Sequence, residues 1–285
     1  MAIKKVIQIS DLHIPNDNKK RPFDKMLDSF FNQLIENEFG GIKEDGDYWR
    51  DDYRIVICGD IFEDKIRASN EARNLFHDFL NKCSNLCGTI VIAGNHDLLT
   101  NNKDRIDSIT PTFQVLNAYD GSVRYCDKDL NYKSGYIPDE NVIWNLFSIF
   151  NNFADTGFTK DLKENEDIKI IGLFHGDIVG AVTDNGYTSK HGVDNSVFSE
   201  CDCVMAGHIH KHQEIIANGV PVVYGGSLFQ HDAGENINKH GYVVWDIDTM
   251  EYELKEIDND YRIFKFVIND FDDFKNDNIT LKNVY

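Results

Sequence analysis

Long apolar runs and basic residues are both scarce in this sequence, and each shortage excludes a class of protein. No stretch approaches the roughly 18 to 20 consecutive apolar residues that cross a bilayer. The opening MAIKKVIQIS has too short an apolar stretch to be a secretory signal. We therefore expect a soluble, cytoplasmic protein that does not enter a membrane.

Lysine and arginine total only 29 against 48 aspartates and glutamates, which gives the 285-residue chain a net charge of −19. This balance disfavours loose, charge-driven adhesion to nucleic acid or to an anionic membrane. The net charge does not exclude a polyanionic substrate, because cations bound at one place can invert the local charge.

Cysteine use indicates neither disulfides nor a structural zinc site. Cys58, Cys201 and Cys203 lie inside apolar runs, whereas Cys83 and Cys87 fall within a helical pattern. In a long cytoplasmic chain these are expected to be reduced, buried thiols. Zinc ligation by the C-D-C of residues 201–203 is a minor alternative.

Apolar runs of strand length recur along the chain and end in small or polar residues. Their nearly continuous apolar character is typical of strands covered on both faces. The runs are KKVIQISD, RIVICGD, TIVIAGNHD, IKIIGLFHGD, CDCVMAGH and VPVVYGGS.

Two amphipathic helices are predicted, one between the first and second of these strands and the other between the second and third. Apolar residues step by three and one from Phe23 to Ile35 and again from Ala72 to Cys83, where Ser69 can cap the second helix. After Val220, the runs GYVVWDID, YELKEI and YRIFKFVI lack helical spacing and predict consecutive antiparallel strands. We expect one α/β domain over residues 1–268 and an acidic tail over 269–285.

Potential metal ligands follow five of the apolar runs at the point where each run ends. In open α/β sheets the strand ends converge on one rim, so residues distant in sequence can meet there. Carboxylate, amide and imidazole donors suit Mn²⁺, Fe or Zn²⁺, and seven ligands suffice for two ions that share one carboxylate. The seven residues are Asp11, His13, Asp60, Asn95, His175, His208 and His210. The two aspartates could instead cap helices, but capping does not explain ligand types at five strand ends.

The order of five short motifs resembles the calcineurin-like metallophosphoesterases. These motifs are D-L-H (11–13), G-D (59–60), G-N-H-D (94–97), H-G-D (175–177) and G-H-I-H (207–210). The resemblance implies a four-layer αββα sandwich of two mixed sheets, and two metal ions bridged by Asp60. The implied ligand sets are Asp11, His13, Asp60 and His210 for one ion, and Asp60, Asn95, His175 and His208 for the other.

Three further stretches look like the SbcD-type (Mre-eleven-like) DNA exonucleases, including their compact phage and large-virus forms. They are GDIFEDKIRASNEA, RIDSITPTF and VVYGGSLFQHDAGEN, the last followed by HGYVVWDI. The resemblance implies a Mn²⁺-dependent nuclease in DNA repair, recombination or genome processing, an SMC-like ATPase partner of SbcC type, and dimer formation. We expect no full-size capping domain. A phage-encoded protein would be located in the host cytoplasm, and the nucleoplasm is an alternative location.

His96 is the candidate acid for the leaving oxygen, with Asp97 expected to fix its orientation. Weaker candidates for contacts with nucleic acid are Lys19, Arg21, Arg105, Lys190 and His191. His77, His231 and His240 are expected to be structural or exposed. The alternative functions are a phosphodiesterase for nucleotides or other small molecules, a phosphoprotein phosphatase, and a non-catalytic scaffold.

Overall fold

A computed structural model describes residues 1–17, 22–41, 48–65, 67–99, 101–102, 104–116, 122–153, 167–258 and 260–264. Lys19, Arg21, the expected tail at 269–285 and the end of the YRIFKFVI run lie outside these described residues. Among the helices that are described, none is long and apolar enough to traverse a bilayer.

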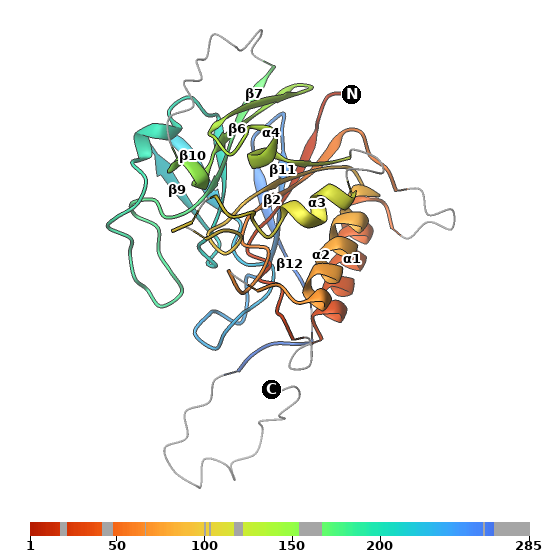
Figure 1. Cartoon of the computed structure of the whole chain (residues 1–285). Coiled ribbons are helices and arrows are strands. Elements are labelled where there is room, and N and C mark those ends of the chain that lie inside the picture. The colour runs from red at the N-terminus through yellow and green to blue at the C-terminus, as the bar shows by residue number, and fades with distance from the viewer. Residues whose placement is uncertain are drawn as a thin grey trace, which may run out of the picture.

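Two mixed, six-stranded sheets form the centre of the described chain (Figure 1). The first sheet has the order β12-β11-β1-β2-β3-β4, in which β1 to β4 are parallel. Its strands are β12 (Tyr252–Glu256), β11 (Gly241–Asp246), β1 (Lys5–Ile9), β2 (Tyr53–Cys58), β3 (Gly88–Ile92) and β4 (Val123–Tyr125). The second sheet has the order β5-β6-β7-β8-β10-β9, in which β6, β7, β8 and β10 are parallel. Its strands are β5 (Gly135–Asp139), β6 (Val142–Phe147), β7 (Lys169–His175), β8 (Cys203–Gly207), β10 (Val220–Tyr224) and β9 (Gln213–Ala217).

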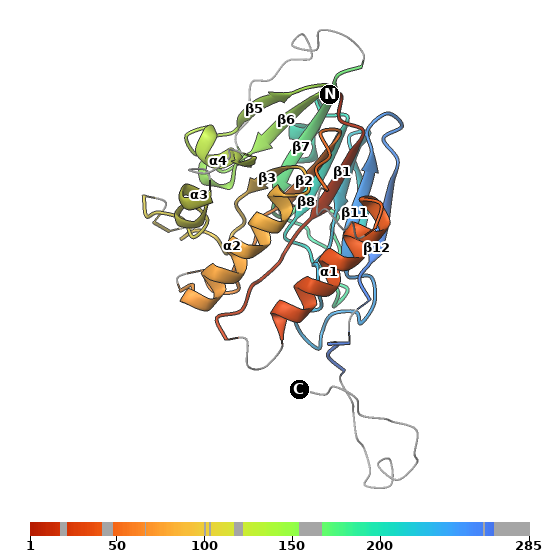
Figure 2. The same cartoon turned by 90° about the vertical axis from the view of Figure 1, so that its right-hand side faces the viewer.

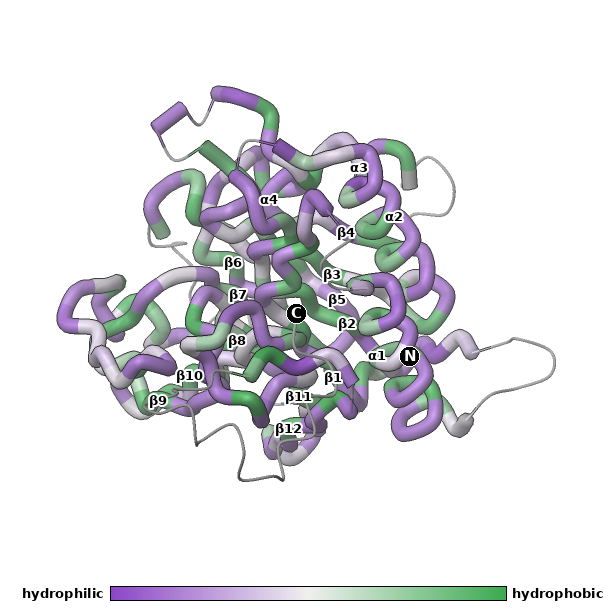
Figure 3. Tube along the Cα trace, turned by 90° about the horizontal axis from the view of Figure 1, so that it is seen from below, coloured by the Kyte–Doolittle hydropathy of each residue, from purple (hydrophilic) through white to green (hydrophobic). Residues whose placement is uncertain are grey.

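Successive residues of β1 point into two different cores. Val6 packs between the two sheets, in the same buried cluster as Trp144. Ile7 packs beneath α1 (Phe23–Glu38) and α2 (Asn70–Ser84), which cover the outer face of the first sheet (Figure 2). Both faces of the strand are therefore buried, which explains its continuous apolar sequence. Along the tube in Figure 3 the central strands are accordingly mainly apolar.

The predicted α/β sandwich is confirmed, with a thinner cover on the second sheet. Within the described residues, the outer face of that sheet packs against loops and the short η3 (Asn195–Phe198), whose Phe198 contacts Phe174 of β7. The other short helices in the described part of the chain are α3 (Thr110–Leu116), α4 (Cys126–Asp129) and η1 (Ile149–Asn151).

Both predicted helices are confirmed, and Ser69 accepts a hydrogen bond from the Ala72 N–H at 3.0 Å as an N-terminal cap. One strand prediction fails in its described part, because residues 261–264 form no strand. The sequence NVIWNLFSIF contains β6, whose residues are all buried, although its pattern did not indicate a strand.

Gln8 joins the two sheets through hydrogen bonds in the buried interface between them. Its Nε2 donates to the carbonyl oxygens of Ala206 and Val223 at 3.1 and 2.9 Å. Its Oε1 accepts from Trp245 Nε1 at 2.9 Å. Because a buried amide is costly unless it is fully paired, this network favours one position of β1 relative to β8 and β10 of the facing sheet.

Asp127 is a buried carboxylate whose ionisation opposes folding. It accepts hydrogen bonds from the Ala93 N–H at 2.8 Å and from Ser148 Oγ at 2.5 Å. Burial nevertheless raises the pKa of Asp127 to about 6. An unfolded aspartate titrates near about 3.9, so the native state holds this proton more tightly. The protonated Asp127 carboxyl therefore adds its full contribution to the free energy of unfolding below about pH 4, and this contribution is lost as the pH rises through about 6.

Asp127→Asn is expected to raise the free energy of unfolding at pH 8 by about 2 kcal/mol and to change it little at pH 4. Urea denaturation at both pH values measures this difference. Asp78→Asn on the exposed face of α2 is the matched control and should change neither value. Equal destabilisation by Asp127→Asn at both pH values would contradict the assignment.

Candidate metal centre

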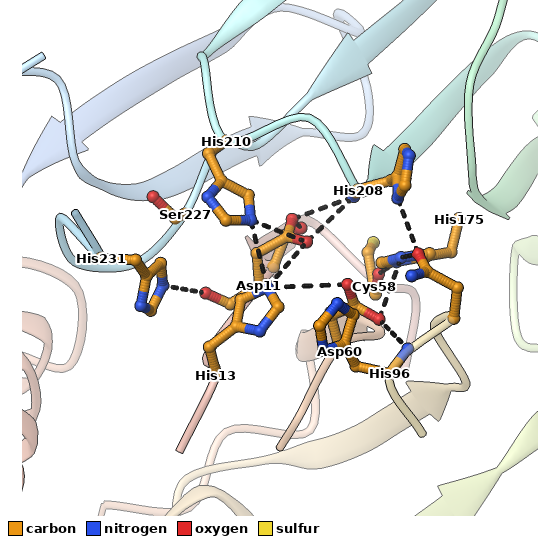
Figure 4. Close-up of polar contacts among 12 residues, drawn as sticks. Asp11, His13, Cys58, Asp60, His96, His175, His208, His210, Ser227 and His231 are labelled. Atoms are coloured by element: carbon orange, nitrogen blue, oxygen red, sulfur yellow. Dashed lines mark hydrogen bonds and ion pairs between the residues drawn. The ribbon is translucent and has the colours of Figure 1, made fainter. Parts of the chain in front are cut away.

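All seven predicted ligands lie at one rim, where parallel strands of both sheets end. Figure 4 labels six of them, all except Asn95. The strands that deliver them are β1 for Asp11 and His13, β2 for Asp60, β3 for Asn95, β7 for His175, and β8 for His208 and His210. Each ligand lies within four residues of the end of a buried strand. The packing of the two sheets therefore brings ligands from both sheets together.

The first group consists of Asp11, His13 and His210. The Nε2 atoms of the two histidines lie 3.1 Å apart, and each is 3.9 Å from Asp11 Oδ1. Two ring nitrogens and a carboxylate oxygen thus converge on one point. This convergence is the arrangement that a shared cation requires.

The second group consists of Asp60, His175 and His208, together with the amide of Asn95. Asn95 Oδ1 lies 3.2 Å from His175 Nε2 and 2.7 Å from His208 Nδ1. His175 donates from Nδ1 to the Cys58 carbonyl oxygen at 2.6 Å, which leaves its Nε2 facing the group.

Asp60 belongs to the second group and also faces His13 of the first. Its Oδ1 lies 3.2 Å from His175 Nε2, and its Oδ2 lies 3.6 Å from His13 Nε2. The side chain is 3% exposed, so water does not screen either contact strongly. One oxygen faces each group, as in a carboxylate that bridges two cations.

The backbone at the centre adopts conformations that L-residues rarely occupy. The φ angles are 51° at Asp11, 44° at His13, 53° at Asp60 and 97° at His208. Such strain persists only where the surrounding structure enforces it, and it concentrates at functional sites. Gly94 is required by close packing, because a Cβ there would overlap the amide and carboxylate of Asp60.

Burial and neighbouring charges set the protonation of three of these histidines. Burial lowers the pKa of His13 to about 4, so its ring is neutral and available to a cation. Burial also opposes protonation of His175, but the Asp60 carboxylate outweighs it and raises the pKa to about 9. For His210, burial is outweighed by the hydrogen bond with Glu235, and the pKa is likewise raised to about 9. Cation binding at His175 or His210 therefore displaces a proton.

The donor set fits a dinuclear centre of divalent cations. All donors are carboxylate or amide oxygens and imidazole nitrogens, the ligands that Mn²⁺, Fe and Zn²⁺ accept. The nearby thiol of Cys58 is fully buried, and burial raises its pKa well above the usual range. Cys58 is therefore protonated and does not act as a thiolate ligand.

His96 borders the first group, and Asp97 does not have the orienting role expected for it. The His96 ring lies edge-on to His13, with 4.7 Å between centroids, and its Nδ1 donates to the Glu63 carbonyl oxygen at 2.7 Å. Asp97 is buried and accepts from the N–H groups of Ile61 at 3.0 Å and Gly94 at 2.9 Å. Its carboxylate is directed to these amides because buried N–H groups need acceptors. Asp97 therefore stabilises the loops that carry Asp60 and Asn95.

Three residues near the centre were not predicted as site residues. Glu235 lies 2.7 Å from His210 Nδ1, and Asp177 lies 3.6 Å from His208 Nε2. His231, expected to be structural or exposed, contacts the rings of both first-group histidines at 4.8 and 5.2 Å and donates to the Asp11 carbonyl oxygen at 3.0 Å. Asp177 belongs to the H-G-D motif, which is the one signal that could have indicated it.

The weaker candidates for nucleic-acid contact are exposed where the structure describes them. Arg105 lies before α3, and Lys190 and His191 lie in the loop between β7 and η3. Their contact with a substrate stays a prediction.

The two facing sheets and the paired carboxylate–histidine groups form a candidate dinuclear metal centre. The family model described as calcineurin-like phosphoesterase matches residues 4–212, and the chain belongs to this family. It is therefore a metallophosphoesterase, a class that acts on phosphoesters through a dinuclear metal centre.

The chain is similar to several individual proteins, and the structure from Thermus thermophilus supports the fold. The chain is 29% identical over 270 residues to the uncharacterized protein R555 of Acanthamoeba polyphaga mimivirus, covering 91% of this chain but only 18% of that protein. The crystal structure of TT1561 from Thermus thermophilus is similar with a TM-score of 0.55 at 12% identity, covering 90% of this chain and all of the other. A structure described as a novel archaeal phosphodiesterase matches with a TM-score of 0.43 at 14% identity, over 89% of this chain and 98% of that one.

Proposed function

We propose that this protein is a Mn²⁺-dependent phosphodiesterase that cleaves DNA, a nuclease of SbcD type acting in repair, recombination or genome processing. An SMC-like ATPase partner, dimer formation and a location in the cytoplasm of a cell or viral host belong to the same proposal. The family establishes phosphoester hydrolysis, whereas the choice of DNA rests on further residues.

The observation that carries the choice of DNA is the position of the third SbcD-like stretch, VVYGGSLFQHDAGEN. This stretch continues from β10 and contacts the two loops that carry the first group. The Ser227 N–H donates to the His210 carbonyl oxygen at 3.0 Å, and the Leu228 N–H donates to the Ser10 carbonyl oxygen at 3.2 Å. The nuclease-like part of the sequence is thus part of the wall of the metal centre.

Two divalent cations in this centre would lower the pKa of bound water and neutralise charge on the phosphoryl oxygens. Asp11, His13 and His210 would hold one cation, and His175, His208 and Asn95 the other, with Asp60 between them. His96 keeps its Nδ1 proton on the Glu63 carbonyl oxygen. A second proton, taken up on Nε2, would be the one that the imidazolium passes to a leaving oxygen, which returns the ring to its neutral form.

Four labelled substrates separate the candidate functions when they are incubated with the Mn²⁺-loaded chain. We expect cleavage of single-stranded or duplex DNA and of a chromogenic phosphodiester, with slower hydrolysis of a phosphomonoester. Hydrolysis of the small esters without DNA degradation would overturn the nuclease proposal. A fully metal-loaded chain that cleaves none of the four would favour a scaffold. Asp60→Asn serves as the control for a contaminating nuclease, since it must abolish every activity.

A further inference from the structure

Each group contains a histidine that is backed by a carboxylate outside the group. Glu235 Oε1 lies 2.7 Å from His210 Nδ1, and the Glu235 side chain is 6% exposed. Asp177 Oδ2 lies 3.6 Å from His208 Nε2, and the Asp177 side chain is 45% exposed. The first contact is shorter and far less accessible to water, so it constrains its histidine more strongly.

Glu235 also connects the loop at His231 to the first group through hydrogen bonds. Its second oxygen accepts from the His231 N–H at 2.8 Å. His231 in turn donates from Nε2 to the Asp11 carbonyl oxygen at 3.0 Å. One buried carboxylate is thereby connected to His210 directly and to Asp11 through a single intermediate residue.

This hydrogen bond selects the tautomer of His210. A carboxylate only accepts, so the neutral imidazole must keep its proton on Nδ1. The unprotonated Nε2 then points to the position shared with His13 Nε2, 3.1 Å away. A carboxylate behind a ligating imidazole also increases the basicity of the ligating nitrogen.

We propose that Glu235 is a positioning residue for the cation of the first group, holding His210 with Nε2 directed to that cation and securing residues 227–235 beside it. The inference concerns the metal centre and not the substrate. No DNA enters its test, so its failure leaves the nuclease proposal standing, and the converse also holds.

Mn²⁺ titration of the full-length, metal-free chain by calorimetry tests this role. Glu235→Gln keeps the length of the side chain and an oxygen for the His231 N–H, but removes the charge. We expect one of two Mn²⁺ affinities, corrected for the proton that His210 releases on binding, to fall about 10- to 100-fold and the other to change less than about threefold. His13→Asn, which removes a ligand of the first group, identifies the affected binding step. Asp177→Asn is the matched control and should leave that step unchanged.

A second readout separates positioning from packing. Nitrogen-15 NMR of the metal-free chain, at a pH above the His210 pKa of about 9 where the ring is neutral, should show His210 protonated on Nδ1 in the wild type and a mixture of tautomers in Glu235→Gln. Glu235→Asp keeps the charge and should recover part of the affinity, and it replaces Glu235→Gln if the latter does not fold. Unchanged Mn²⁺ affinities in the folded variant, or His210 protonated on Nε2 in the wild type, would overturn the proposal.

Discussion

Asp60→Asn is expected to lower kcat/KM for phosphodiester hydrolysis by roughly 1,000-fold or more and to leave the chain folded. Asparagine keeps the shape of the side chain and an oxygen for the His96 N–H, which Asp60 Oδ1 accepts at 2.7 Å. It removes the charge that faces both His175 and His13, at 3.2 and 3.6 Å. Because one carboxylate serves both groups, both cations should bind more weakly.

Steady-state kinetics at saturating Mn²⁺, together with the number of ions retained after gel filtration, measures this loss. Asp78→Asn removes an exposed carboxylate from α2 and should match the wild type in both assays. Retention of two tightly bound ions by Asp60→Asn, with activity within about tenfold of the wild type, would show that Asp60 does not bridge them.

His96→Ala is expected to lower kcat by about 100- to 1,000-fold while both cations stay bound. The imidazole reaches the edge of the first group, with its ring 4.7 Å from that of His13. The backbone N–H that supports Asp60 is retained in alanine, so the metal centre should survive. A loss confined to kcat would identify a group that acts on the leaving oxygen.

The kinetics of His96→Ala are compared with those of His77→Ala, which removes a partly exposed histidine from α2. The number of bound Mn²⁺ ions is measured for both variants. Full activity in a metal-loaded His96→Ala chain would remove His96 from the mechanism.

The sequence was sufficient to predict which residues gather at this rim, because each lies at the end of a buried strand or within four residues of it. Apolar runs indicate where β1, β2, β3, β7 and β8 end, and parallel strands bring those ends to one rim. The structure places the seven predicted residues together, and their role as ligands stays a prediction. The two helices are confirmed because their apolar pattern is local. The two facing sheets, which the family resemblance implied, are confirmed as well.

Features that depend on how loops fold back could not be predicted in this way. Glu235 follows no strand and reaches His210 only because residues 225–235 turn toward β8. Asp97 adjoins His96 in sequence, yet the chain directs its carboxylate to the amides of Ile61 and Gly94. In β6 both faces are buried, so its apolar residues show no alternation that distinguishes a strand from a buried helix.

A crystal structure of the Mn²⁺-soaked protein, with anomalous data collected at the manganese edge, tests the metal centre most directly. Two anomalous peaks are expected, roughly 3.5 to 4 Å apart, one on each side of the Asp60 carboxylate. A single peak, no peak, or two peaks that do not share Asp60 would contradict the dinuclear centre on which the proposed hydrolysis depends.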